Sequence, residues 1–350
     1  MGTAVCLKIM KLYINSNTNP YFNLAAEEYL ITHAQDDIIM LWRNEPSVII
    51  GKNQNAFAEI DFGFVRENDI KVVRRLTGGG AVFHDLGNLN YTFISPSSGR
   101  LSEGIREGGL DFAHFTKPII EALCGLGVAA RLSGRNDIIV DTDDGERKIS
   151  GNAQCVVDGT TLHHGTLLHS AHMERLKGAL KPDEDKLRSK GIASVRSRVA
   201  NLCDLFDDKA LETAGDIESF TKYLTDWLSE GFGVTSEELT DKMTAEIEAL
   251  SQEKYSTDKW NIDRFGDFTQ TRKKRFGFGS LEADLKVEVG HIAAVSIGGD
   301  FFGERDIAEL CKKLVGCEYS REPLITVLSE IGVGRYIYGA NADEIAEFLL

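Results

Sequence analysis

The stretch KVVRRLTGGGAVFHDLGNLNYTFIS, residues 71–95, is the most informative segment for the class of fold. Three short runs, Lys71–Leu76, Ala81–His84 and Leu89–Ser95, are separated by the breaks Thr-Gly-Gly-Gly and Asp-Leu-Gly-Asn. Runs of this length and composition between glycine-bearing breaks are typical of antiparallel strands joined by turns. The segment therefore predicts a β-meander.

The residues before this segment predict one helix among strands. A strand is expected at Leu7–Ile14. A helix should begin after Asn19, because Asn is a favoured N-cap residue and Pro20 suits the first helical position. Two β-rich runs, Ile38–Arg43 and Ser47–Lys52, flank an Asn-Glu-Pro turn and predict an antiparallel hairpin.

The residues after it alternate in the same irregular way. Apolar residues at helical spacing predict a helix at Asp111–Cys124, which two following glycines should end. Three β-rich runs follow at Asn136–Asp141, Lys148–Val157 and Thr161–Ser170. This order is not the regular strand-helix repeat of a doubly wound parallel sheet. We expect an α+β fold, with a mixed and largely antiparallel sheet flanked by helices.

The second half of the chain predicts a separate small α/β domain. Amphipathic helices are expected at Ile217–Leu228 and Ser236–Leu250, followed by a connector. The predicted boundaries are 8–252 for a large first domain, 253–261 for the connector and 262–350 for a C-terminal accessory domain. Within the accessory domain we expect three strands and two helices, at Thr271–Gly279, Leu281–Val289, His291–Ile297, Arg305–Leu314 and Glu322–Ile331.

Charge and composition narrow the classes of function. The chain of 350 residues carries 54 acidic and 39 basic side chains, a net charge of −15, which works against general affinity for nucleic acid. Its 6 cysteines are scattered without a C-x-x-C pair, which predicts reduced thiols in the cytoplasm. Apolar runs fall short of the ~18 residues that a membrane span needs. The N-terminal run is broken by Lys8 and Lys11, so we expect neither signal peptide nor membrane anchor.

The triple glycine Gly78–Gly80 is the first candidate for ligand binding. Glycines between two strands leave backbone N–H groups open and permit positive φ angles, so an anion can approach the main chain. Arg74 and Arg75, just upstream, can offer charge-assisted hydrogen bonds to the same anion. The segment is neither a Walker A loop nor a dinucleotide fingerprint. From these residues alone, an anion cradle and a simple turn both remain open.

Two basic features downstream have two interpretations each. Lys148 begins a strand that runs into Ser-Gly, where its ammonium group would either neutralise an anion in a cleft or lie in solvent. The stretch Lys186–Arg198 is rich in Lys and Arg within an acidic chain. It would either fold over a nucleotide or form a solvated surface.

The segment 163–172 contains four histidines but favours packing over metal binding. On a strand, His163 and His169 share one face and His164 lies on the other. No cysteine or acidic residue has the spacing usual for a metal site. Cys155 lies in a strand pattern with nothing that marks a reactive thiolate, so no nucleophile is identified.

Taken together and in this order, these segments resemble the lipoate-protein ligases. The resemblance extends from about Leu12 to Leu205, and eight motifs in series carry it. They are PYFNLAAEE at 20–28, LWRN at 41–44, VIIG at 48–51, the glycine segment at 74–88, GRND at 134–137, RKISGNA at 147–153, HHGTLL at 163–168 and KGIASVRSR at 190–198.

The resemblance implies a biotin/lipoate ligase catalytic fold in the first domain and a reaction in two steps. Lipoate and ATP, with Mg²⁺, would give lipoyl-AMP and pyrophosphate. The lipoyl group would then pass to a lysine of an apo lipoyl domain, such as the glycine cleavage H protein or the E2 subunits of 2-oxoacid dehydrogenases, in lipoate salvage. An acyl-adenylate activates a carboxylate without an enzyme nucleophile, which agrees with the sequence.

Carried over residue by residue, the resemblance makes Lys148 the catalytic residue. It would hold the lipoate carboxylate and the α-phosphate, and so contact both substrates. The loop Lys190–Arg198 would close on the adenylate. Further ATP contacts are implied for Arg75, Gly80, Ala81, Val82 and Phe83.

The lipoyl tail needs an apolar tunnel. Burying its four methylenes is worth on the order of 3 kcal/mol. The resemblance implies lipoate contacts for Trp42 and His84, and Val48, Ile50 and Val82 are further candidates for the walls beside Trp42.

Two other functions stay open at this point. Related octanoyltransferases use an acyl carrier protein and a cysteine thiol. In one branch that cysteine lies where this chain has Ser133, Gly134 and Arg135, which is a departure from the transferase pattern. A non-catalytic lipoate-binding module is the third possibility. The residues from Ile262 onward resemble the ligase accessory domain only in size and position.

Overall fold

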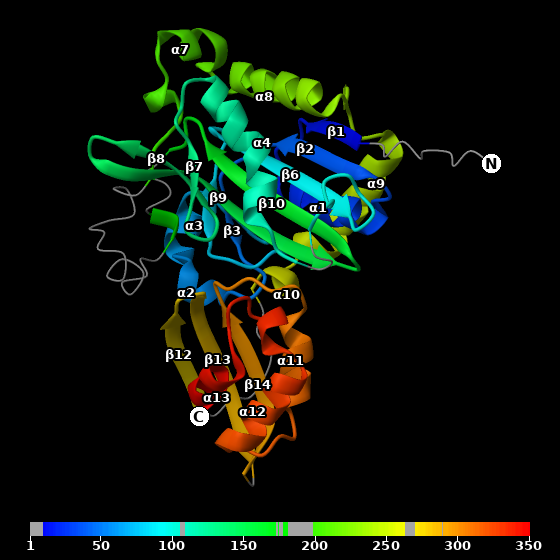
Figure 1. The fold of residues 1–350 in the computed structure, drawn as a ribbon, viewed down its shortest axis with the longest axis vertical. Coiled ribbons are helices and arrows are strands. Elements are labelled where there is room, and N and C mark those ends of the chain that lie inside the picture. Colours follow the sequence, from blue (N-terminus) through cyan, green and yellow to red (C-terminus); the bar gives the residue numbers. More distant parts are fainter. Residues whose placement is uncertain are drawn as a thin grey trace, which may run out of the picture.

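The computed structural model describes residues 10–105, 109–172, 174, 178–180, 199–262, 270–288 and 290–350. It shows a larger body built on an eight-stranded sheet and a smaller one built on a three-stranded sheet (Figure 1). The predicted loop Lys190–Arg198 and the rest of the basic stretch from Lys186 lie outside the described residues. Among the residues that are described, no helix is both long enough and apolar enough to cross a membrane.

The central sheet is mixed and largely antiparallel, which confirms the predicted class of fold. Its strand order is β11-β1-β2-β6-β10-β9-β8-β7. Strand β1 pairs in parallel with β2 and β11, whereas the other neighbours are antiparallel. The strands are β1 (Met10–Asn15), β2 (Asp37–Trp42), β6 (Asn88–Pro96), β7 (Arg131–Ser133), β8 (Asp137–Thr142), β9 (Gly145–Val157), β10 (Thr160–Leu168) and β11 (Ser236–Glu237).

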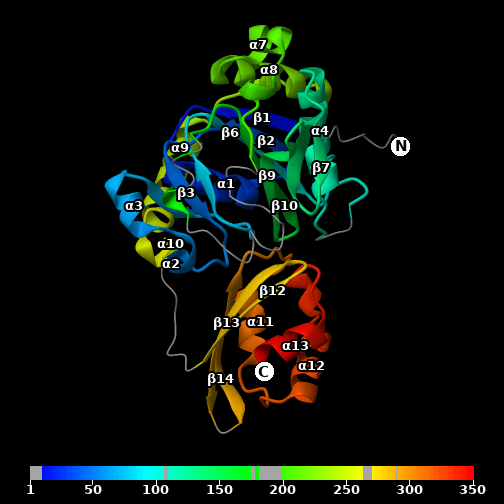
Figure 2. The same ribbon diagram turned by 90° about the vertical axis from the view of Figure 1, so that its left-hand side faces the viewer.

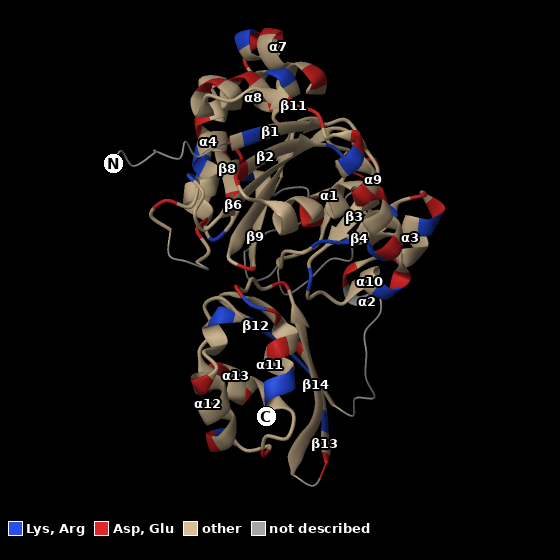
Figure 3. Ribbon diagram, turned by 90° about the vertical axis from the view of Figure 1, so that its right-hand side faces the viewer, with Lys and Arg blue, Asp and Glu red and all other residues tan. Residues whose placement is uncertain are grey.

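Helices cover both faces of this sheet. Side chains alternate along a strand, so Leu12 and Ile39 enter one hydrophobic cluster, and Tyr13 and Met40 enter the other. The first cluster includes α4 (Phe112–Gly125) and α8 (Ile217–Phe232), and the second includes α1 (Pro20–His33) and α9 (Asp241–Leu250). The short α7 (Asp208–Ala214) packs beside α8. Figure 3 shows Lys, Arg, Asp and Glu on the outer helices, while the strands of the sheet are mostly uncharged.

Helix α1 begins as its sequence predicts. The side chain of Asn19 accepts a hydrogen bond from the backbone N–H of Tyr21 at 3.0 Å, and Pro20 occupies the first turn. Asn therefore satisfies one of the backbone donors that every helix start leaves open. The α4 prediction is also confirmed, with Asp111 as its N-cap.

A second, three-stranded sheet corrects two of the sequence predictions. Its order is β4-β3-β5, formed by β3 (Ser47–Ile50), β4 (Lys71–Arg74) and β5 (Val82–His84). The predicted hairpin of Ile38–Arg43 with Ser47–Lys52 is wrong, because β2 pairs with β1 and β6, while β3 pairs with β4 and β5. The predicted meander is also wrong, because β4 and β5 both pair with β3, and β6 belongs to the central sheet. Local patterns show that a run is a strand, not which strand it pairs with.

Two unpredicted helices explain the parallel pairing of β3 with β4. Helices α2 (Ala56–Glu59) and α3 (Phe62–Glu67) lie between these strands in the sequence. Parallel neighbours need a crossover connection, which these helices supply. The 253–261 stretch, predicted as a connector, is itself largely helical, with a turn of π-helix at Ser251–Tyr255 and α10 at Asp258–Asn261.

The accessory domain matches its predicted order of elements and adds one helix. An antiparallel sheet of β12, β13 and β14 packs against α11, α12 and α13 in one hydrophobic cluster (Figure 2). Helix α13 was not predicted, and it starts where Asn341 accepts a hydrogen bond from the N–H of Glu344. The elements are β12 (Gln270–Phe276), β13 (Gly279–Glu288), β14 (His291–Gly299), α11 (Ile307–Leu314), α12 (Arg321–Glu330) and α13 (Ala342–Leu349).

Candidate active site

The glycine turn Thr77–Gly80 lies where the two bodies meet. The N–H of Gly79 donates to the carbonyl of Phe301 at 3.1 Å. Gly79 has φ +89°, which favours glycine, and a Cβ there would lie 2.9 Å from the Phe302 ring. A Cβ at Gly78 would lie 2.1 Å from the carbonyl oxygen of Phe301. The turn therefore needs glycine both for its backbone shape and for close contact with the accessory domain.

Arg75 is buried inside this turn and holds its carbonyl groups. Its Nη2 donates to Gly78 O at 2.6 Å and to Gly80 O at 2.9 Å, and its Nη1 donates to Ile49 O at 3.2 Å. Its Nε donates to Thr77 Oγ1 at 2.8 Å. Burial lowers the pKa of this guanidinium to about 10, which leaves it charged at neutral pH. The described contacts of Arg75 thus shape the turn, and its predicted contact with ATP stays a prediction.

Lys148 lies at an irregularity of the central sheet. Ile138 is opposite Ser150 and Ile139 is opposite Lys148, so Ile149 is an extra residue in β9, a β-bulge. The Lys148 ammonium nitrogen lies 2.7 Å from Asp137 Oδ1, and the two side chains are 20% and 15% exposed. This cation is therefore held in a half-buried position and does not lie free in solvent.

Phe302 of the accessory domain contacts both of these regions. Besides its contact at Gly79, its ring packs with Phe112 at a centroid distance of 5.1 Å. The Arg135 guanidinium carbon lies 4.4 Å from the ring centroid, a cation–π contact. Arg135 is two residues before Asp137, the partner of Lys148. Phe302 therefore contacts both the glycine turn and the turn at residues 134–136, which joins β7 to β8.

The predicted lipoate contacts Trp42 and His84 lie close together, but two of the predicted walls do not join them. The rings of Trp42 and His84 are 6.1 Å apart, and Val82 packs in the cluster that contains Trp42. Val48 and Ile50 belong to a different cluster, on the other face of β3. Because neighbouring strand residues point to opposite faces, Ile49, not Val48 or Ile50, enters the Trp42 cluster.

Three buried polar atoms near Trp42 have no hydrogen-bond partner among the described residues. They are His84 Nε2, Asn88 Oδ1 and Asn90 Nδ2. His84 Nδ1 is used, since it lies 3.1 Å from Asn44 Nδ2. Asn90 is directly opposite Trp42 across β2 and β6. Buried polar atoms are usually satisfied by protein, water or ligand, so these atoms indicate a place for a bound molecule.

The buried imidazole of His84 predicts an acid-sensitive fold. Burial lowers its pKa from 6.5 to about 3. The unfolded chain therefore takes up this proton first, and stability is lost as the pH falls from 6.5 toward 3. From about pH 7.5 to about pH 5.5 this one group should cost about 1.4 kcal/mol, measured by urea unfolding.

The matched variants are His84→Gln and His172→Gln. His172 is exposed, so its loss should leave the acid sensitivity of the wild type intact. His84→Gln should lose less stability than the wild type over the same pH interval. Equal losses in the wild type and His84→Gln would contradict the neutral, buried state of His84.

The histidines of β10 and its end make packing and hydrogen-bonding contacts, as the sequence favoured. His163 is buried and stacks on Phe115 with ring centroids 5.3 Å apart. His164 bonds to Glu27, and His169 Nε2 lies 2.8 Å from Ala214 O. Cys155 is buried, and burial raises the pKa of its thiol to about 12, which makes it a poor nucleophile.

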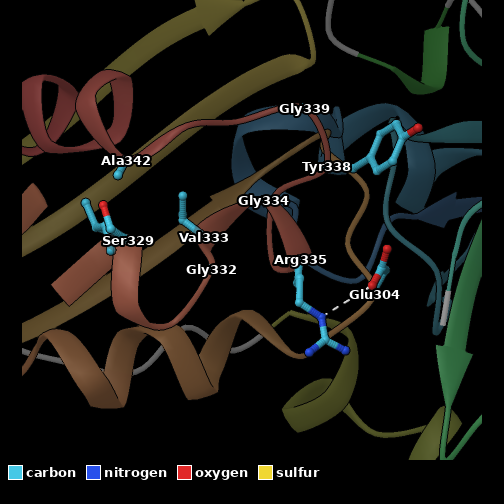
Figure 4. Close-up of a pocket in the computed structure, with 10 residues that line it drawn as sticks. Glu304, Ser329, Gly332, Val333, Gly334, Arg335, Tyr338, Gly339 and Ala342 are labelled. Atoms are coloured by element: carbon cyan, nitrogen blue, oxygen red, sulfur yellow. Dashed lines mark hydrogen bonds and ion pairs between the residues drawn. The ribbon is translucent and has the colours of Figure 1, made fainter. Parts of the chain in front are cut away.

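A separate pocket of about 440 Å³ lies in the accessory domain (Figure 4). The turn Gly332–Arg335 and the side chains of Glu304 and Tyr338 contribute to its wall. Arg335 Nε lies 3.5 Å from Glu304 Oε2. The lining residues include no residue that the sequence placed at a substrate.

Two family models and a curated relative match this chain. Residues 19–228 match the lipoyl protein ligase A/B catalytic domain, and residues 266–349 match the bacterial lipoate protein ligase C-terminus. The lipoate-protein ligase LplJ of Bacillus subtilis strain 168 is 40% identical over 341 residues, which are 96% of this chain and 98% of that protein.

Solved structures agree with these matches. LipL1 of P. falciparum, in complex with lipoate, shares the fold with a TM-score of 0.77 at 24% identity, over 98% of this chain and 99% of that one. A lipoate-protein ligase A bound with ATP has a TM-score of 0.57 at 28% identity, over 72% and 97%. A bi-partite lipoate protein ligase of Thermoplasma acidophilum, described with its E2 lipoyl domain, has a TM-score of 0.59 at 30% identity, over 74% and 99%. The glycine turn Thr77–Gly80 and Lys148 both lie within the residues that match the catalytic-domain model. This chain belongs to the lipoate-protein ligase family.

Proposed function

We propose that this lipoate-protein ligase works through lipoyl-AMP and transfers the lipoyl group to a lysine of an apo lipoyl domain. In the first step a carboxylate oxygen of lipoate attacks the α-phosphorus of ATP, and pyrophosphate leaves. In the second, the lysine amine attacks the acyl carbon, loses a proton and displaces AMP. The relatives bound to ATP and described with an E2 lipoyl domain support both steps.

The single observation that carries this mechanism is the position of the Lys148 ammonium group, which is fixed by its ion pair with Asp137. A carboxylate and an α-phosphate repel each other, so their approach needs a fixed positive charge between them. The ammonium group of Lys148 is half-buried beside Asp137 and lies close to Gly151, where a Cβ would be 2.5 Å from its nitrogen. A fixed cation costs little reorganisation when the substrates meet.

The glycine turn is the proposed site for the nucleotide. Arg75 holds the carbonyls of Gly78 and Gly80, and the N–H of Gly79 donates to Phe301 O, so we propose other backbone N–H groups of the turn and of Ala81–Phe83 as donors to phosphate and base. Arg75 itself would add positive charge to this region, even though its guanidinium lies within the turn. Gly80, Ala81, Val82 and Phe83 are therefore the proposed backbone contacts of ATP.

The lipoyl group is proposed to lie against Trp42 and His84. The indole of Trp42 is 3% exposed and forms an apolar wall with Val82. The unpartnered Nε2 of His84 is close to this wall and can donate to the bound acid. Val48 and Ile50 are not part of the proposed lipoyl site, because they pack on the other face of β3.

Mg²⁺ is proposed as the companion of ATP. Among the described residues no group of three His, Cys, Asp or Glu side chains lies together, so a protein-built metal cage is not evident there. Mg²⁺ commonly takes most of its ligands from phosphates and water with one or two carboxylates. An ion held mainly by the phosphates of ATP would screen their charge.

We also propose the domain boundaries 8–252, 253–261 and 262–350, and a cytoplasmic reaction. One hydrophobic cluster draws all its residues from the stretch between Phe276 and Leu349, which supports a separate C-terminal domain. Five described cysteines are free thiols, in keeping with a reducing compartment.

The test is lipoate-dependent exchange of labelled pyrophosphate into ATP. We expect exchange that requires lipoate, and AMP together with lipoylated product when an apo lipoyl domain is added. Candidates for that acceptor are the glycine cleavage H protein and E2 lipoyl domains. Transfer from octanoyl-carrier protein without exchange would indicate a transferase, and lipoate binding without either activity would indicate a binding module.

A further inference from the structure

A buried chain of hydrogen bonds joins helix α1 to the glycine turn. His164 Nδ1 lies 2.8 and 3.0 Å from the two carboxylate oxygens of Glu27. His164 Nε2 lies 2.8 Å from Thr77 Oγ1, which also accepts the Arg75 Nε–H at 2.8 Å. Glu27 is 1% exposed, Thr77 0% and His164 8%. The turn is thus connected to a buried carboxylate on a different element.

The proton positions in this chain follow from what each atom can donate. Thr77 Oγ1 accepts from Arg75, so its own hydrogen is available for His164 Nε2. His164 then carries its proton on Nδ1 and donates it to Glu27. In this arrangement every donor has an acceptor, and the negative charge of Glu27 balances the buried positive charge of Arg75.

Glu27 is itself held at a fixed angle. Thr92 Oγ1 donates to Glu27 Oε1 at 2.7 Å and accepts the indole N–H of Trp42 at 2.8 Å. A carboxylate with two donors on it has little freedom to rotate. The chain therefore runs from Trp42, at the proposed lipoyl site, to Arg75, inside the proposed nucleotide turn.

We propose that Glu27, acting through His164 and Thr77, is a positioning residue that holds Arg75 and the glycine turn in the shape that binds ATP. The inference rests on the proposed nucleotide site. Arg75 aligns the turn through Gly78 O and Gly80 O. Its Nε–H is held by Thr77 Oγ1, which is held in turn by His164. Removing an orienting hydrogen bond behind a binding group weakens the site without touching the ligand.

The first variant is Glu27→Gln, with Glu28→Gln as its matched control. Glu28 is the next residue of α1 and is also ion-paired, with Lys254 Nζ at 2.6 Å and Tyr255 Oη at 2.7 Å. Those contacts lead to the 251–255 helical turn and not to the glycine turn.

Glu27→Gln removes the charge and one acceptor oxygen, and should raise the KM for ATP about tenfold, the effect of losing one charge-assisted hydrogen bond. The KM for lipoate should rise less, because Thr92 still accepts the Trp42 indole N–H. Glu28→Gln should match the wild type in both.

A second pair tests the chain at its other end and does not depend on the folding of Glu27→Gln. Thr77→Val removes the hydroxyl, and Thr77→Ser keeps it. Thr77→Val should raise the KM for ATP by a similar factor, while Thr77→Ser should stay near the wild type. In the double variant Glu27→Gln/Thr77→Val, the second change should add little, because one broken link already interrupts the chain.

Calorimetric titration with ATP alone separates this inference from the proposed reaction. If the wild type binds ATP but shows no exchange, the ligase mechanism fails, and the ATP affinities of these variants still decide the role of Glu27. Equal ATP affinity in the wild type, Glu27→Gln and Thr77→Val would overturn the inference. So would equal losses for ATP and lipoate in both Glu27→Gln and Glu28→Gln, which would show a general loosening of α1.

Discussion

Replacing Lys148 by alanine is expected to lower lipoate-dependent pyrophosphate exchange by about a thousandfold. One preorganised charge-stabilising group in an active site is typically worth ~10² to 10³ in rate, and Lys148 would act on both the carboxylate and the α-phosphate. The fold should survive, because the ammonium group lies at a partly exposed ion pair. The exchange rate at saturating ATP and lipoate, together with urea unfolding, measures both effects.

The control for this variant is Lys71→Ala. Lys71 also forms an ion pair, with Glu45, but lies on β4 away from β9. It should retain near-normal exchange. Asp137→Asn would be informative beside it, since it frees the ammonium group without removing it, and should reduce the rate less than Lys148→Ala. Normal exchange by Lys148→Ala would remove this residue from the mechanism.

Replacing Arg74 by methionine is expected to destabilise the fold by about 4 kcal/mol. Arg74 is 8% exposed, and its guanidinium donates to five backbone carbonyls. Loss of the side chain removes a donor from five carbonyl oxygens, of which Gly51 O keeps the N–H of Gln54. Each buried carbonyl oxygen left without a donor costs roughly 1 to 3 kcal/mol before relaxation. The acceptors are the carbonyl oxygens of Gly51, Lys52, Gln54, Trp260 and Asn261.

The matched control is Arg131→Met. Arg131 also has several partners, Asp141 and Glu146, but on an exposed surface where ion pairs contribute little. Equilibrium unfolding in urea should show a much smaller change for Arg131→Met than for Arg74→Met. Arg74→Lys should not restore stability, because one ammonium group cannot replace the planar fork of donors. A small effect of Arg74→Met would mean that water satisfies those carbonyls.

The sequence predicted most elements of both domains, and the reasons are local. Asn19 and Pro20 mark a helix start by chemistry that acts within one turn. Pairing is different, because it depends on residues far apart in the chain. The Ser47–Lys52 run was correctly predicted as a strand, but it pairs with β4 and β5 and not with β2. No residue within the run specifies which strand it pairs with.

The candidate site was predicted in part for a similar reason. Lys148 and the triple glycine were identified from short motifs. The contacts of Phe302 with Gly79 and Arg135 were not, because the accessory domain carries no motif that points to the turn. Glu27 was missed although it stands in the PYFNLAAEE motif. A carboxylate within the apolar part of a helix was the available signal, since charged residues are rarely buried without a partner.

The bulge in β9 determines which side chains of this strand lie on the same side of the sheet as Lys148. Side chains alternate with a period of two, so one unpaired residue shifts the phase of that alternation for everything that follows. With Ile149 as the extra residue, Lys148 is opposite Ile139 and Ser150 is opposite Ile138, so these two side chains lie on opposite faces although they are two residues apart. Without the bulge, the side chains from Ser150 onward would lie on the other face of the sheet relative to Lys148. The site would then be lost through spacing alone, with every side chain unchanged.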